Sequence, residues 1–161
     1  MKKIILSIII VFVCSFSIAQ DMSGPNTLKT NTADMGNNLI GLDPSLGGYV
    51  FYLTPDGKHG LVAATSDQST SADWYLAPDV ISNPDNYDTN GKKFTDWRLP
   101  TKYELNLMYT QKNSIGAFDS NYYWSSIENG STSAWLKNFG NGSQDYGSKD
   151  RPNNVRAVRT F

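Results

Sequence analysis

The sequence predicts an α+β domain built mainly from an antiparallel sheet with one helix, and two observations support this fold class. Short segments of aromatic and β-branched residues are separated by turn sequences such as Pro55-Asp56-Gly57 and Asn129-Gly130. One amphipathic helical segment, at about 102–112, lies between them. A helix among several hairpins indicates α+β architecture rather than regularly alternating strands and helices.

A hairpin is predicted at the start of the domain. Residues 49–53 and 60–64 are aromatic, β-branched or small, and a Pro-Asp-Gly turn joins these two strand segments. Residues 66–93 are polar and irregular, so we expect a long loop there. A loop of this length in a compact domain is often functional.

The helix is predicted from its cap and from its apolar face. Thr101 and Glu104 have the spacing of a capping box, in which each side chain bonds to the backbone N–H of the other residue. Leu105, Met108 and Tyr109 follow at helical spacing and define one apolar face. The helix therefore begins just after Pro100.

Three later strands are expected, at residues 122–126, 133–139 and 155–160, with turns at 129–130 and 140–142. Large apolar side chains near the helix and in these strands are expected to form the core. They are Trp97, Leu99, Leu105, Trp124 and Phe139.

The N-terminal residues predict export. Lys2 and Lys3 precede an apolar run at 4–13, and Ser17-Ile18-Ala19 has the small-x-small pattern of a signal-peptidase site. The run is about half of the ~20 residues that a membrane span needs, so we expect cleavage after Ala19 rather than a membrane anchor. This gives a signal peptide at 1–19, a flexible leader at 20–46 and a domain at 47–161, which is secreted, periplasmic or on the cell surface.

Composition excludes several classes of function. The 14 basic and 15 acidic residues are balanced, which argues against general nucleic-acid binding because that needs a positive field. The single cysteine, Cys14, leaves with the signal peptide, so the mature chain has no thiol nucleophile and no cysteine metal ligand. The single histidine, His59, is interpreted as a hairpin residue rather than a general base.

A segment at residues 86–91 resembles the start of a calcium loop. Asn86, Asp88 and Asn90 alternate before Gly91, as calcium ligands do. However, Trp97 occupies the twelfth position, where a bidentate glutamate belongs, so we interpret the segment as a polar turn. We expect no cofactor and no metal site, and no ligand motif supports calcium.

Aspartates in the predicted loop region could include a catalytic pair. They are Asp67, Asp73, Asp79, Asp85 and Asp88. A carboxylate-dependent hydrolase therefore stays open as an alternative function, although solvated loop carboxylates are the commoner case. Arg98, Arg156 and Arg159 are interpreted as structural ion-pair or carbonyl-binding residues, and no catalytic residue is assigned.

Six short motifs occur in one order along the chain. They lie at residues 47–53, 59–68, 96–105, 123–126, 134–139 and 155–159. Together they resemble the bacterial domain of unknown function 1566, also called the Legionella collagen-like protein C-terminal domain. That family is similar to the C-type lectin fold in its formylglycine-generating-enzyme-like form. The resemblance implies this scaffold but not the oxidase activity, which depends on cysteine.

A binding role is expected from the resemblance and from residues 119–154, which are rich in Asn, Ser, Tyr, Gly and Trp. Aromatic residues supply contact area and small polar residues supply adaptable hydrogen bonds, as in antibody binding sites. The candidate ligand residues are Tyr122, Asn141, Gln144, Tyr146 and Arg151. The sequence thus predicts a non-enzymatic module that recognises an extracellular glycan or protein, and a structural or assembly protein of the envelope is a further alternative.

Overall fold

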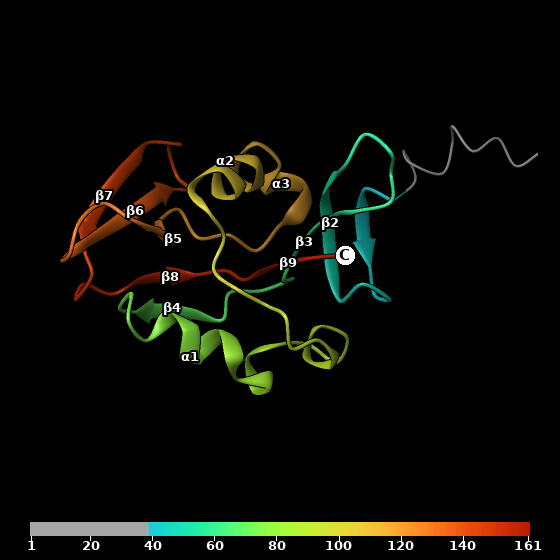
Figure 1. Ribbon diagram of the computed structural model, residues 1–161, viewed down its shortest axis with the longest axis horizontal. Helices are drawn as coiled ribbons and strands as arrows, with labels where there is room; N and C mark the ends of the chain where they lie inside the picture. Colours follow the sequence, from blue (N-terminus) through green and yellow to red (C-terminus); the bar gives the residue numbers. More distant parts are fainter. Residues whose placement is uncertain (1–38) are drawn as a thin grey trace, which may run out of the picture.

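The computed structural model describes residues 39–161 and confirms an α+β fold with mostly antiparallel sheets. The predicted signal peptide and most of the predicted leader lie outside the described residues. Figure 1 shows two sheets at opposite ends of the domain, with α2 and α3 on one side and α1 on the other. Within residues 39–161, no helix is long and apolar enough to cross a membrane.

The first sheet contains the predicted N-terminal hairpin. Its strands, in spatial order, are β1 (Gly41–Asp43), β2 (Gly48–Leu53), β3 (Gly60–Ala63) and β9 (Val158–Thr160). All of its strand pairs are antiparallel. Because β1 pairs with β2, residues 41–43 at the end of the predicted leader lie against the first sheet as an edge strand.

The second sheet carries the C-terminal half of the chain. Its spatial order is β4 (Ser69–Ala72), β8 (Asn153–Val155), β5 (Tyr122–Glu128), β6 (Ser133–Asn138) and β7 (Gln144–Ser148). The β5–β8 pair is parallel and the other pairs are antiparallel. Only Arg156 and Ala157 separate β8 from β9, so this short segment joins the two sheets (Figure 1).

The helices pack on both sides of the second sheet. They are α1 (Ala77–Ser82), the short 3-10 helices η1 (Pro84–Asn86) and η2 (Gly91–Lys93), α2 (Lys102–Thr110) and α3 (Lys112–Ile115). The predicted capping box is present, since Thr101 Oγ1 accepts from the Glu104 amide and Glu104 accepts from the Thr101 amide. The predicted helix at 102–112 is interrupted at Gln111, where α2 ends and α3 begins.

Four elements were not predicted in the segment expected to be a loop. Residues 66–93 contain the edge strand β4, the helix α1 and the 3-10 helices η1 and η2. α1 has only six residues, and it buries Ala77 and Ile81 against the core. A helix this short is unstable alone, so packing rather than local propensity explains its presence.

The predicted core residues are all buried. Trp97, Leu99, Leu105, Trp124 and Phe139 are between 0% and 8% exposed. Trp97 and Leu99 belong with Trp124 to one cluster under α1, while Leu105 and Phe139 belong to a second cluster under α2. The helix entry at 97–101 therefore anchors to the first cluster, and α2 itself anchors to the second cluster through Leu105.

Candidate ligand-binding face

An exposed aromatic and cationic surface lies where β6 and β7 meet the first turn of α2. It consists of Lys102, Trp135, Gln144 and Tyr146, and we call it the β7 face. The Lys102 Nζ lies 3.2 Å from the centroid of the Trp135 ring. Tyr146 meets Trp135 edge to face, with 5.9 Å between ring centroids. Gln144 Nε2 donates to the Lys102 carbonyl oxygen at 3.4 Å.

The strand register explains why these side chains meet. Trp135 on β6 is the direct cross-strand partner of Tyr146 on β7. Side chains alternate between the two faces of a strand, and the neighbouring Ala134 and Leu136 are buried in the core, which leaves Trp135 on the outer face. Cross-strand aromatic pairs of this kind stabilise the sheet and fix both rings in place.

The structure brings together some of the predicted ligand residues and separates others. Gln144 and Tyr146 share the β7 face, and Tyr146 is 57% exposed. They lie on the edge strand β7, which is not among the three later strands predicted from the sequence. Residues 144–148 lack a buried apolar alternation, and the hydrogen bonds to β6 make them a strand.

The other predicted ligand residues have different surroundings. Asn141 is exposed in the turn before β7, where its Oδ1 accepts from the Ser143 amide at 2.9 Å. Tyr122 begins β5 and is half-buried against the core. Arg151 is exposed in the turn beyond the opposite end of β7. The side chains of Tyr122 and Asn141 therefore serve the fold, and Arg151 lies apart from the β7 face.

Sequence reasoning missed Lys102 and Trp135 as members of this face. The strand pattern of Ala134, Trp135 and Leu136 could have indicated Trp135. If Ala134 and Leu136 face the core, Trp135 must lie on the other face of the same strand. Lys102 had no such signal. Its contact with Trp135 joins residues 33 positions apart and depends on how α2 packs on β6.

The interior holds a buried ionic network centred on Arg156. Arg156 is fully buried, and its Nε donates to Asp67 Oδ1 at 2.6 Å. Asp67 Oδ2 accepts from the Tyr123 hydroxyl at 2.8 Å. Burial raises the pKa of Asp67 although Arg156 and Tyr123 oppose the shift, and burial raises the pKa of Tyr123 as well. Asp67 was expected to be a solvated loop carboxylate, and this expectation was wrong.

The remaining arginines also have the structural roles expected from the sequence. Arg98 forms two hydrogen bonds with Glu104, at 2.8 and 2.7 Å, and so braces the start of α2. Arg159 pairs with Asp96 at 2.8 Å and donates to the Leu46 carbonyl oxygen. In the described part of the chain, no buried side-chain nitrogen or oxygen lacks a hydrogen-bond partner.

The acidic loop residues are held in turns. Asp88 Oδ1 accepts from the amides of Asn90 and Gly91, and Asp88 Oδ2 accepts from the Thr65 hydroxyl. Asp73 Oδ1 accepts from the Leu76 amide before α1. No group of three or more His, Cys, Asp or Glu side chains that could hold a metal ion occurs among residues 39–161. In the segment that resembles a calcium loop, the Asp88 carboxylate is hydrogen-bonded to the amides of its own turn.

The ion pair at the start of α2 predicts a pH-dependent stability. Burial alone would raise the pKa of Glu104, but hydrogen bonds from Arg98 and Thr101 lower it below its ordinary value of 4.5. A lowered carboxyl pKa adds stability above 4.5 that is lost as the pH falls through the folded-state value. Glu104→Gln is therefore expected to lose about 1–2 kcal/mol of unfolding free energy at pH 7 and less below pH 4.5.

Urea denaturation of both proteins at several pH values measures this difference. Asp150→Asn, at an exposed residue of the turn after β7, is the control and should match the parent protein throughout. A Glu104→Gln deficit that stays constant into the acid range would contradict the assigned role of the Arg98–Glu104 pair.

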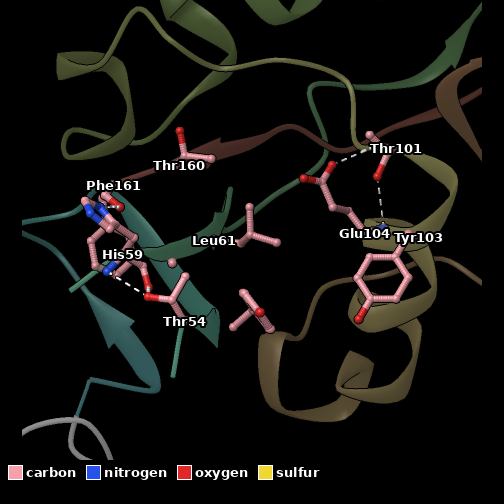
Figure 2. Close-up of a pocket in the computed structure, with 10 residues that line it drawn as sticks. Thr54, His59, Leu61, Thr101, Tyr103, Glu104, Thr160 and Phe161 are labelled. Atoms are coloured by element: carbon pink, nitrogen blue, oxygen red, sulfur yellow. Dashed lines mark hydrogen bonds between the residues drawn. The ribbon is translucent and has the colours of Figure 1, made fainter. Parts of the chain in front are cut away.

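A second concave site lies between the first sheet and α2. It has a volume of about 460 Å³ and is lined by residues of β2, β3, α2 and the C-terminal segment. Figure 2 shows Thr54, His59 and Phe161 on one side of the cavity and Thr101, Tyr103 and Glu104 on the other, with Leu61 between them. His59 lies at the end of the turn that joins β2 to β3, as expected from the sequence. We call this cavity the Tyr103 pocket.

Comparison with protein families identifies the kind of domain. The model of the Lcl C-terminal domain matches residues 52–159. The chain belongs to the Lcl C-terminal domain family. The match covers the second sheet, strand β3 and most of strand β9 of the first sheet, the β7 face and most of the Tyr103 pocket. It confirms the resemblance to the Legionella collagen-like protein C-terminal domain. Membership in this family is compatible with a non-enzymatic binding or structural module. No curated protein matches the chain.

Proposed function

We propose that this protein is a non-enzymatic recognition module that works outside the cytoplasm and binds a glycan or protein ligand through the β7 face. Its location follows from the predicted signal peptide at 1–19, which directs the mature chain to the periplasm, the cell surface or the medium. A C-type-lectin-like scaffold belongs to the same proposal. The Lcl C-terminal domain supports a binding or structural role in general terms.

The observation that carries the proposal is an exposed tyrosine held on a rigid support. Tyr146 is 57% exposed, yet its ring is fixed against Trp135, which is itself covered by the Lys102 ammonium. Aromatic anchors that are ordered before binding lose little conformational entropy when a ligand arrives. Tyrosine, tryptophan and charged neighbours are also typical of residues that dominate binding energy.

The chemistry of the face suits an uncharged or weakly acidic partner with exposed C–H groups. Tyr146 offers a ring face and a hydroxyl, Gln144 offers an amide, and Lys102 offers a positive charge. The four residues of the β7 face do not include a nucleophile that lies beside a general base. Binding without chemistry is therefore the function that this geometry supports best.

The test is a binding screen of the purified chain on glycan and protein arrays, followed by titration of each ligand found. Tyr146→Ala is expected to weaken binding by at least about tenfold and to change stability by no more than about 0.5 kcal/mol. Tyr75→Ala is the matched control, because Tyr75 is also an exposed tyrosine, at 59%, but lies outside both the β7 face and the Tyr103 pocket.

Two outcomes would contradict the proposal. The absence of saturable binding on both arrays would favour a structural or assembly role in the envelope. A Tyr146→Ala variant as unstable as a core variant would show that this side chain serves the fold, so that the ligand contacts lie elsewhere. N-terminal sequencing of the exported protein tests the location independently and should begin at Gln20.

A further inference from the structure

The Tyr103 pocket has the size and composition of a small-molecule site. Its volume of about 460 Å³ falls within the range of about 300–1,000 Å³ that is usual for such sites. Leu61 is buried at its base, and Phe161 is half-buried beside it. Tyr52 and Tyr103, which line it from β2 and α2, are 37% and 65% exposed.

The hydrogen-bonding groups of the pocket fall into two sets. Thr54, Thr101 and Glu104 are already used by the fold. The Thr54 hydroxyl bonds to Asp56 and to the backbone of His59, and the Thr101 hydroxyl accepts from the Glu104 amide. Both carboxylate oxygens of Glu104 accept hydrogen bonds from Arg98.

The second set is open to a ligand. The hydroxyls of Tyr52, Tyr103 and Thr160 have no hydrogen-bond partner within residues 39–161, and the same is true of His59 Nε2. His59 Nδ1 lies 3.2 Å from the Phe161 carbonyl oxygen, which fixes the ring beside the cavity (Figure 2). The pocket therefore combines apolar surface with several unused polar groups at its rim.

The charge of the lining defines the ligand further. Among the described residues that line the pocket, none is Lys or Arg. Its one side-chain carboxylate, on Glu104, is neutralised by Arg98 at 2.7 Å. Apart from His59, the side chains of the lining therefore offer neither a cation to an anionic ligand nor an unpaired carboxylate to a cationic ligand. The complementary ligand is uncharged, with an apolar face for the rings and hydroxyl groups for the rim.

We propose that the Tyr103 pocket binds an uncharged sugar ring. A pyranose has this combination, because its C–H groups pack on aromatic rings while its hydroxyls both donate and accept hydrogen bonds. The site is separate from the β7 face, since Lys102 contacts Trp135 whereas the adjacent Tyr103 lines the pocket. The proposal therefore stands or falls independently of the ligand of the β7 face.

The experiment is an NMR titration of the isotopically labelled chain with methyl glucoside and with N-acetylglucosamine. Binding is measured through the changes in the backbone amide chemical shifts. Saturable shifts are expected at Gly60, Leu61, Tyr103 and Thr160. Tyr103→Ala is expected to weaken binding by at least about tenfold. Tyr75→Ala is the matched control that should bind as the parent does, because Tyr75 is also an exposed tyrosine, at 59%, and lies outside both the pocket and the β7 face. Glucuronic acid and glucosamine, the charged counterparts, should bind at least about tenfold more weakly than the neutral sugars.

Three results would overturn the proposal. They are no saturable shift with either neutral sugar, shifts confined to the β7 face, and equal affinity for neutral and charged sugars. Thermal melts of both variants accompany the titrations, and His59→Ala provides a second pocket variant at an exposed turn residue. Binding lost by Tyr103→Ala and His59→Ala but kept by Tyr75→Ala would place the sugar in the pocket.

Discussion

Arg156→Ala is expected to lower the free energy of unfolding by about 3–5 kcal/mol, because it leaves a buried carboxylate without its partner. Arg156 is 0% exposed, and its Nε pairs with Asp67 at 2.6 Å. Its guanidinium also donates to the carbonyl oxygens of Ala64, Gly116 and Ala117. The last two residues have positive φ values of 77° and 56°, so this arginine fastens the turn between α3 and β5.

Chemical denaturation of the parent protein and four variants, Arg156→Ala, Arg156→Lys, Asp67→Ala and the double alanine variant, measures this effect. Arg156→Lys should recover little of the loss, because an ammonium cannot reproduce the fork of donors that reaches several acceptors at once. The double variant Asp67→Ala with Arg156→Ala should lose less stability than the sum of the two single variants, since it leaves no unpaired buried charge. If the stability loss of the double variant equals the sum of the losses of the two single variants, Asp67 and Arg156 are not energetically coupled and the account of this pair is wrong.

Trp124→Ala is expected to cost about 3–5 kcal/mol as well, through the cavity that it leaves in the core. Trp124 is 0% exposed, and its Nε1 donates to the Ala72 carbonyl oxygen at 3.0 Å. The side chain thus ties β5 to β4 across the sheet. Such a loss is a large part of the 5–15 kcal/mol that typically stabilises a domain.

Trp135→Ala on the neighbouring strand is the matched comparison for Trp124→Ala. Trp135 is only partly buried and faces Lys102 and Tyr146 on the surface. Its removal should lower the melting temperature clearly less than removal of Trp124. Equal effects of the two substitutions would show that the β7 face contributes to the core, against the binding role proposed for it.

The elements predicted correctly are those whose signals are local. The capping box of Thr101 and Glu104 fixes the start of α2 within four residues of sequence, and Pro55-Asp56-Gly57 joins two segments that must pair as neighbours. β1, α1 and β7 have no comparable signal. β1 and β7 depend on hydrogen bonds to a neighbouring strand, and α1 depends on burial of Ile81.

The same distinction applies to the candidate sites. Gln144 and Tyr146 were selected from composition alone, because they lie in the stretch 119–154, which is rich in Tyr, Asn and Ser. The support of Tyr146 by Trp135 and Lys102 could not be predicted, because α2 must first pack on β6. Asp67 and Arg156 are 89 positions apart in the sequence, so neither the ion pair nor the pocket between β2 and α2 was visible before the fold was known.

The most direct test of the binding role is a chemical-shift map of the chain with the ligand selected on the arrays. The proposed function predicts that the largest changes fall on the backbone amides of Lys102, Gln144 and Tyr146 and on the indole N–H of Trp135, and that Tyr146→Ala removes them while the protein stays folded. A map whose largest changes avoid all four residues would contradict the assignment of the β7 face as the ligand-binding surface.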